Sequence, residues 1–224
     1  MENLKKIFIH GWSFNRDIWK DYFNLENSSF LNLPCHTNNG SFEKPYMESF
    51  KEKLLEEIEN SDDEVVLIGW SLGASISVLT ALENPKNLKK LILIGFTPKF
   101  NDKYLGHDPV AVRAFLISLR KMYEPTIFRF RKRAVNNEFK DIPLPFPKEC
   151  GIDILEEFVN LDLVKQLKNL KQEIILIHGN KDVIVNPSSL LLTAKLIPKA
   201  RPIMVNSHHG PFLEEKDIII KCLA

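Results

Sequence analysis

The stretch from Val65 to Gly73 (V-V-L-I-G-W-S-L-G) places a serine between a predicted strand and a predicted helix. Residues 65–68 form a short β-branched apolar run, and residues 72–82 have the length and the Ala/Leu content of a buried helix. Ser71 therefore falls at a strand-to-helix turn, the context that a G-x-S-x-G motif requires. The glycines leave room for the neighbouring strand and helix, and the helix directs its free N–H groups toward negative charge that develops near the hydroxyl.

Short apolar strands alternate with helices in the first and last parts of the chain. The pattern predicts strands at residues 6–9, 28–33, 65–68, 91–95, 173–178 and 202–205. It predicts helices at residues 17–23, 47–58, 72–82 and 213–223, and another that begins near residue 187. Strands without polar alternation, separated by helices, are typical of a parallel sheet that is covered on both faces. We therefore expect an α/β fold with a mostly parallel central sheet.

The strand pattern stops after Phe96 and resumes near residue 168. In between, the sequence predicts three helices and no strand, with a proline-punctuated segment before the third helix; the helices are expected at residues 109–122, 126–135 and 152–158. A segment of this length is too long for a loop within a compact sheet protein. We expect residues 97–167 to form a helical lid above the carboxyl ends of the strands, inserted into a core of residues 1–96 and 168–224.

A catalytic serine needs a base that takes its proton and a carboxylate that fixes the tautomer of that base. In this architecture the acid and then the base follow the serine, each at the carboxyl end of a later strand. Asp182 follows one predicted strand in H-G-N-K-D, and His208 and His209 follow the last strand. We predict Asp182 as the acid and His209 as the base, with His208 facing solvent. Taken by itself, Asp182 also fits an ordinary turn aspartate, and the order of the residues favours the catalytic interpretation.

The loop after the first strand reads H-G-W-S-F at residues 10–14. A loop at this place supplies the second N–H of the oxyanion hole in such folds. We assign this donor to the backbone N–H group of Trp12. The Trp12 indole fits a wall of an acyl pocket or, like Trp19, an aromatic core residue. We expect His10 to be structural.

Charge is nearly balanced over the whole chain but not along it. The 30 basic and 29 acidic residues argue against a nucleic-acid-binding protein. Between Lys99 and Lys140, however, ten basic residues face four acidic ones, a local charge of +6. A positive face of this kind, near the mouth of a pocket, suits an acidic carrier protein and its phosphate. The alternative is a solvated helix face.

Three further features bear on location and cofactors. No apolar run approaches the ~20 residues of a membrane span, and the first residues lack a secretory signal, so we expect a cytoplasmic protein. Cys35, Cys150 and Cys222 are odd in number and widely spaced, which predicts three free thiols and no disulfide. Neither a C-x-x-C nor an H-x-x-x-H motif indicates a metal site, so we expect no metal and no cofactor.

With these residues in place, the chain resembles the α/β-hydrolase family over essentially its full length. Within that family it is similar to the carboxylesterases of biotin synthesis that cleave the methyl ester of pimeloyl-acyl-carrier protein. The matching motifs are H-G-W-S at residues 10–13, G-W-S-L-G at residues 69–73, G-x-x-D ending at Asp182, and H-G-P-F at residues 209–212, where the family has H-x-P-F. Residues 32–37 depart from the family, because they read N-L-P-C-H-T in place of D-x-P-G-x-G.

The resemblance implies roles for the residues that match its motifs. Ser71 is the expected nucleophile, His209 the base and Asp182 the acid, with Trp12 and Leu72 forming the oxyanion hole. The segment I-F-R-F at residues 127–130 resembles a lid helix whose arginine and phenylalanine face the carrier protein and the acyl chain. The expected substrate-binding residues are therefore Trp70, Phe128, Arg129 and Phe130.

The expected reaction is hydrolysis of the methyl ester of pimeloyl-acyl-carrier protein, with the acyl carrier protein as partner at the basic lid. Two alternatives stay open. One is a general short-chain carboxylesterase or thioesterase with the same triad. The other is a non-catalytic module that docks an acidic partner through the lid.

Overall fold

A six-stranded sheet forms the centre of the molecule in the computed structural model, which describes residues 4–36, 42–197 and 199–223. The strand order is β2-β1-β3-β4-β5-β6, and all five pairings between neighbours are parallel. The strands are β1 (Leu4–Ile9), β2 (Ser28–Leu31), β3 (Glu64–Trp70), β4 (Leu88–Ile94), β5 (Glu173–Gly179) and β6 (Arg201–Val205). The predicted α/β fold with a mostly parallel sheet is confirmed.

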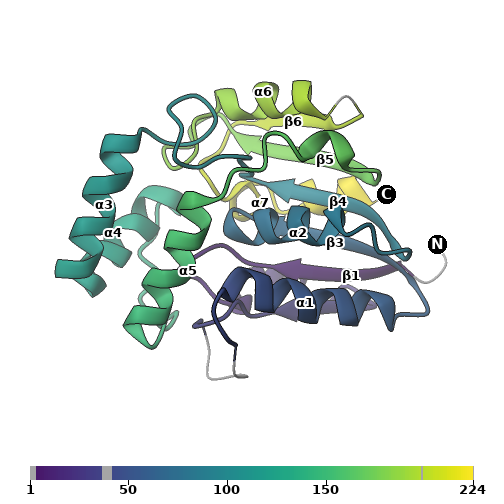
Figure 1. Ribbon diagram of the computed structural model, residues 1–224, viewed down its shortest axis with the longest axis horizontal. Coiled ribbons are helices and arrows are strands. Elements are labelled where there is room, and N and C mark those ends of the chain that lie inside the picture. The colour runs from purple at the N-terminus through teal and green to yellow at the C-terminus, as the bar shows by residue number, and fades with distance from the viewer. Residues whose placement is uncertain (1–3, 37–41, 198, 224) are drawn as a thin grey trace.

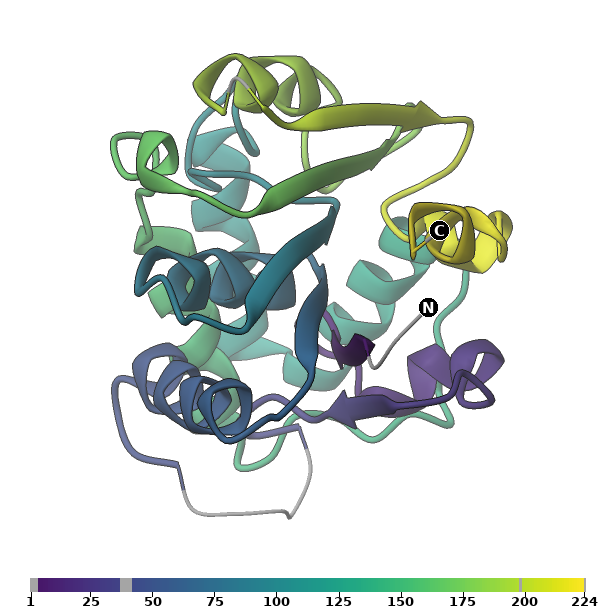
Figure 2. The ribbon, with the colours of Figure 1, turned by 90° about the vertical axis from the view of Figure 1, so that its right-hand side faces the viewer.

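Helices cover both faces of the sheet (Figure 2). One face carries α1 (Tyr46–Glu59), α2 (Leu72–Leu82) and α6 (Ser188–Leu196). The other carries the 3-10 helix η1 (Arg16–Tyr22) and the C-terminal helices α7 (Pro211–Glu214) and α8 (Ile218–Leu223). Side chains of β1 alternate between the two resulting cores: Ile7 and Ile9 lie in one, and Phe8 lies in the other, 5.4 Å from the ring of Trp19.

The three helices between β4 and β5 lie beyond the carboxyl ends of the strands (Figure 1). They are α3 (Pro109–Lys121), α4 (Tyr123–Val135) and α5 (Lys148–Asn160), followed by the short 3-10 helix η2 (Leu167–Asn169). Asp108 begins α3 by accepting hydrogen bonds from the backbone N–H groups of Val110 and Ala111. We refer to residues 97–167 as the lid segment. None of the helices in the described residues is long and apolar enough to cross a membrane.

The prediction of one terminal helix over residues 213–223 is wrong. The structure has two short helices there, α7 and α8, separated by a break at residues 215–217. The Tyr22 hydroxyl donates a hydrogen bond to the Lys216 carbonyl (2.6 Å) and lies 3.3 Å from the Phe212 carbonyl. A side chain from the opposite end of the chain therefore satisfies the carbonyls where the helix is interrupted.

The prediction of three free thiols is also wrong. Cys35 and Cys150 form a disulfide with a Cα–Cα distance of 5.6 Å, and Cys222 is free and buried. The bond joins the segment after β2 to α5 in the lid segment, across 115 residues of sequence. Cysteine spacing carries no signal for such a pair, because only the folded chain brings the two segments together.

Removing this crosslink should destabilise the fold. Cys150→Ser frees a loop of 115 residues in the unfolded chain, and the loop-entropy relation gives an upper value of ~4–5 kcal/mol. We expect guanidinium unfolding to show a lower free energy of unfolding for Cys150→Ser than for the oxidised wild type. Wild-type protein treated with a dithiol is the matched control and should resemble the variant. Equal stability of all three samples would contradict the prediction.

Candidate active site

Ser71 lies on a sharp turn between β3 and α2. Its backbone has φ +55° and ψ −117°, a conformation that non-glycine residues rarely adopt. Neighbouring elements hold it there: the Ser71 N–H donates to the Ile94 carbonyl of β4 (2.8 Å), and its carbonyl accepts from the N–H groups of Ala74 and Ser75. Only 8% of the residue is exposed. The nucleophile candidate is thus held rigidly with restricted access to solvent.

The two glycines of the motif allow the turn to pack against its neighbours. A methyl group added at Gly69 would lie 2.6 Å from the Cα atom of Ala74. One added at Gly73 would lie 2.4 Å from the carbonyl oxygen of Ile9 at the end of β1. Both contacts are with backbone atoms, which cannot rotate away. The close approach brings the first turn of α2 directly against the loop that follows β1.

Asp182 and His209 meet near the carboxyl ends of β5 and β6. The His209 Nδ1–H donates to Asp182 Oδ2 at 2.6 Å, and both side chains are buried. Because Nδ1 carries the proton, Nε2 is the acceptor, and within the described residues it has no hydrogen-bond partner. The ring lies beside Gly95, where an added methyl group would be 2.8 Å from His209 Cε1. Gly95 directly follows Ile94, the residue that accepts the hydrogen bond from Ser71 N–H.

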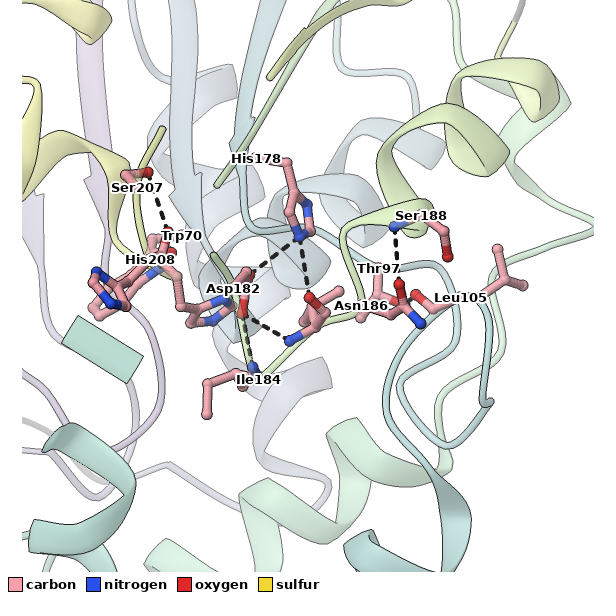
Figure 3. Close-up of polar contacts among 12 residues, drawn as sticks. Trp70, Thr97, Leu105, His178, Asp182, Ile184, Asn186, Ser188, Ser207 and His208 are labelled. Carbon is pink, nitrogen blue, oxygen red and sulfur yellow. Dashed lines mark hydrogen bonds and ion pairs between the residues drawn. The ribbon is translucent and has the colours of Figure 1, made fainter. Parts of the chain in front are cut away.

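The Asp182 carboxylate accepts three hydrogen bonds and has a second histidine beside it. Oδ1 accepts from the N–H groups of Ile184 (2.8 Å) and Val185 (2.9 Å), and Oδ2 accepts from His209. His178 Nε2 lies 3.1 Å from Oδ2 and 3.3 Å from the Val185 carbonyl (Figure 3). Burial alone would raise the pKa of Asp182. The interaction with His209 and the hydrogen bonds from both histidines outweigh it, so its pKa is held well below the usual range. The carboxylate is therefore charged at neutral pH and can stabilise an imidazolium at His209.

His178 has a place in this site that the sequence reasoning missed. It lies at the end of β5, four residues before Asp182, and its ring is buried. The spacing H-G-x-x-D was itself visible, since a strand end and the following turn bring positions i and i+4 together. His208, next to the base, is half-exposed and pairs with Glu214 at 3.0 Å. The two adjacent histidines thus have different surroundings.

Backbone N–H groups next to Ser71 can form an oxyanion hole. A methyl group at Gly11 would lie 3.2 Å from Ser71 Cβ, so the loop after β1 runs beside the serine. Neither the Trp12 N–H nor the Leu72 N–H has an acceptor in residues 4–36, 42–197 and 199–223. The Trp12 indole donates to the Gly151 carbonyl of α5 at 2.7 Å. Two free N–H groups therefore flank the serine.

Two buried histidines form hydrogen bonds with the backbone of this loop and of the segment after β2. His36 Nε2 accepts from the Ser13 N–H (2.9 Å) and His10 Nε2 accepts from the Leu33 N–H (3.1 Å), while each Nδ1 lies within 2.8 Å of a backbone carbonyl. These bonds require the neutral form of each ring. Burial lowers the pKa of His10, and His36 lowers it further. Burial also lowers the pKa of His36 to about 4, against a hydrogen bond to Pro34 that raises it. The expectation of a structural role for His10 agrees with these contacts.

The expected substrate-binding residues lie in different surroundings. Phe130 packs edge-on against Trp12, with ring centroids 5.2 Å apart. Trp70 is buried below the site and donates its indole N–H to the His209 carbonyl at 2.8 Å. Arg129 is exposed and donates to the Thr126 hydroxyl, and the half-buried Phe128 lies against Arg131 and Lys140. The structure brings Phe130 to the loop of residues 10–14, which we call the oxyanion loop. Among the described residues, Phe128 and Arg129 make their contacts elsewhere.

Comparisons with known proteins agree with this architecture. A family model described as "Serine aminopeptidase, S33" matches residues 47–212. Curated relatives named pimeloyl-[acyl-carrier protein] methyl ester esterase are 27% identical in Nitrosospira multiformis (96% of this chain, 90% of the relative) and 29% identical in Pseudoalteromonas atlantica (94% and 89%). An esterase from Exiguobacterium antarcticum superposes with a TM-score of 0.83 at 19% identity, covering 98% of this chain and 90% of that one. An enol-lactonase from Burkholderia xenovorans gives 0.83 at 14%, covering 100% and 90%.

The neutral state of His36 should make stability depend on pH. The unfolded chain takes up a proton near pH 6.5, whereas folded His36 does so only near pH 4. The contribution of neutral His36 to the free energy of unfolding is therefore present in full above pH 6.5 and is lost as the pH falls toward 4. From His36 alone we expect a loss of roughly 2 kcal/mol between pH 7 and pH 5. Urea unfolding at the two pH values measures the loss. His36→Gln keeps an acceptor for Ser13 and should show a smaller loss; an unchanged loss would contradict the assignment to His36.

Proposed function

Because the chain belongs to the serine aminopeptidase S33 family, we propose that it hydrolyses the methyl ester of pimeloyl-acyl-carrier protein through Ser71. The chain has the α/β-hydrolase fold and is a carboxylic ester hydrolase. The substrate is taken from the names of the curated relatives, which align with 94–96% of this chain. The observation that carries the catalytic assignment is the 2.6 Å hydrogen bond from His209 to Asp182, which leaves Nε2 of the histidine free to accept a proton.

The reaction follows from these roles. Ser71 Oγ attacks the ester carbonyl carbon as His209 Nε2 takes its proton, and the N–H groups of Trp12 and Leu72 bind the oxyanion. The bond to the methoxy group then breaks, and methanol leaves with the proton from His209. Water, deprotonated by the same nitrogen, attacks the acyl-enzyme; the bond from the acyl carbon to Ser71 Oγ breaks, His209 returns the proton to Oγ, and the acid is released. Asp182 stays charged throughout and stabilises the imidazolium.

An aromatic group beside the oxyanion loop supports an apolar acyl site. The rings of Trp12, Phe115 and Phe130 lie 5.2 to 6.0 Å from one another. Phe115 comes from α3 and Phe130 from α4, so the lid segment supplies two of the three rings. We propose that the acyl chain runs from Ser71 along these rings to the outer surface of the lid segment, where the carrier protein rests.

Exposed cations on the lid segment suit an acidic carrier. Some basic residues of this region pair with acids, as Lys99 does with Asp162. Five others, all on α3 and α4, are exposed and form no ion pair within the described residues; we call these five the lid cations, Arg113, Lys121, Arg129, Lys132 and Arg133. We propose that they attract the carrier protein and orient its phosphate-bearing arm toward the acyl site.

The proposal also retains two expectations from the sequence. Residues 97–167 are proposed to act as a lid insertion that covers the site, and the protein is proposed to work in the cytoplasm. In such a reducing compartment the Cys35–Cys150 bond would meet cellular thiols. Thiol titration of protein extracted under alkylating conditions tests how much of the crosslink is present there.

Hydrolysis by wild type and Ser71→Ala tests the reaction. We expect the wild type to release methanol from pimeloyl-acyl-carrier protein methyl ester with a much higher kcat/KM than it shows for p-nitrophenyl acetate. Ser71→Ala should lose both activities, since removing a serine nucleophile costs on the order of 10⁶ in kcat. A fluorophosphonate probe should label the wild type alone.

Other outcomes of that experiment select the alternatives. Activity on the small ester but not on the carrier substrate would reject the proposed substrate and favour a general short-chain esterase or thioesterase. Carrier binding without hydrolysis or serine labelling would favour the non-catalytic docking module.

Reversing two lid cations should affect the carrier substrate alone. For Arg129→Glu with Arg133→Glu we expect KM for the carrier substrate to rise roughly tenfold, about 1.4 kcal/mol, because the acidic partner is then repelled. The kcat/KM for p-nitrophenyl acetate should not change. Lys195→Glu, an exposed charge reversal on α6, is the matched control. An unchanged KM in the double variant, or an equal rise in the control, would argue against docking at the lid cations.

A further inference from the structure

Arg131 is a buried cation in the middle of α4. Its side chain has no exposed surface, and it forms no ion pair with a carboxylate in the described part of the chain. Its guanidinium donates instead to backbone carbonyls, those of Ser13, Phe139 (2.7 Å), Ile142 (2.8 Å) and Pro143 (3.0 Å). The planar group also lies 5.4 Å from the ring centroid of Phe14.

A buried charge without a direct ion pair is unusual, because removing it from water is costly. Burial lowers the pKa of Arg131 to about 10, which still leaves it charged at neutral pH. Three of its acceptors belong to the loop that follows α4. The fourth, the Ser13 carbonyl, lies 118 residues away in the loop between β1 and η1. That contact links the lid segment to the loop that carries Trp12.

Ser13 is held on both sides of its backbone. Its φ of +68° is rare for a residue with a side chain. The Ser13 N–H donates to His36, and the Ser13 carbonyl accepts from Arg131. The bond to His36 fixes the planar peptide that joins Trp12 to Ser13, and the bond from Arg131 fixes the next peptide, which joins Ser13 to Phe14. The Trp12 indole is fixed separately by its bond to Gly151. These contacts restrict the backbone on the C-terminal side of Trp12 and its side chain. The Trp12 N–H has no acceptor among the described residues.

The same helix also holds the loop of the base. Three residues after Arg131, the Ala134 carbonyl accepts a hydrogen bond from the His209 N–H at 3.0 Å. The helix α4 thus contacts the loop of Ser13 through the Arg131 side chain and the loop of His209 through a carbonyl of its last turn, and these two loops come from opposite ends of the chain.

We propose that Arg131 is a positioning residue for the oxyanion hole: through the Ser13 carbonyl it holds the Trp12 N–H in place beside Ser71. The inference rests on the proposed serine esterase function. The helix α4 then positions a loop of the proposed catalytic centre, in addition to supplying a ring to the proposed acyl site. The guanidinium does not touch the reacting atoms and acts through the oxyanion hole, which binds charge that develops only in the transition state. Its loss should therefore weaken transition-state binding more than substrate binding.

Arg131→Met and Arg131→Lys test the proposal with p-nitrophenyl acetate and a trifluoromethyl ketone, which forms an oxyanion adduct with a catalytic serine. For Arg131→Met we expect kcat to fall by roughly 10–100-fold, less than or equal to the loss of a whole oxyanion donor, with KM within about twofold. The Ki of the ketone should rise by the same factor as kcat falls. Arg131→Lys keeps the charge, so its kcat and ketone Ki should lie between those of the wild type and those of Arg131→Met. Arg16→Met, the same change at an exposed arginine near the same loop, should match the wild type.

Circular dichroism and active-site titration with a fluorophosphonate give the folded, competent fraction of each variant. If Arg131→Met does not fold, Arg131→Lys carries the test. Wild-type kcat and ketone Ki in a folded Arg131 variant would overturn the proposal. So would a fall in kcat with an unchanged Ki, which indicates a merely structural role. A wild type that neither hydrolyses esters nor labels at Ser71 would instead reject the proposed function itself.

Discussion

A carboxylate that stays charged inside the protein is the constraint on which the proposed catalytic centre depends. Asp182 is buried, yet two histidines, from β5 and from the loop after β6, hold its pKa well below the usual range. Two backbone N–H groups of its own loop also donate hydrogen bonds to the carboxylate. The parallel sheet makes this possible, because its carboxyl ends bring these loops to one edge. The base is oriented only as long as that edge keeps its shape.

A second group of buried polar residues supports the other half of the centre. His10, His36 and Arg131 each satisfy backbone groups in or beside the loop of residues 10–13. The two rings act as neutral acceptors for backbone N–H groups and the guanidinium acts as a donor, so the backbone N–H and carbonyl of Ser13 are both satisfied. Burial disfavours charge on the rings and tolerates it on arginine, whose ordinary pKa is much higher. The loop is therefore held by three side chains of which sequence reasoning gave a role only to His10.

Local patterns predicted most of the fold, and long-range contacts explain the rest. The strands follow from apolar runs and the Ser71 turn from its glycines, so both are encoded within a few residues. Asp182 and His209 could be singled out because chain order and strand ends restrict where such residues lie. The Cys35–Cys150 bond and the contact of Arg131 with Ser13 join segments more than 100 residues apart, and no spacing rule reveals them. The break between α7 and α8 likewise depends on Tyr22, near the other end of the chain.

The contacts of the lid segment limit how freely this segment could be exchanged for that of another protein. An inserted segment that only covers a pocket could be swapped between relatives as a module. Here the segment supplies Arg131 to the loop of Ser13, the Ala134 carbonyl to His209, and Cys150 to Cys35. A chimera that receives a foreign segment without these partners would lose the hydrogen bonds and the disulfide that join this segment to the core. Changes in substrate range should therefore arise more readily on α3, whose Phe115 reaches the site without holding it.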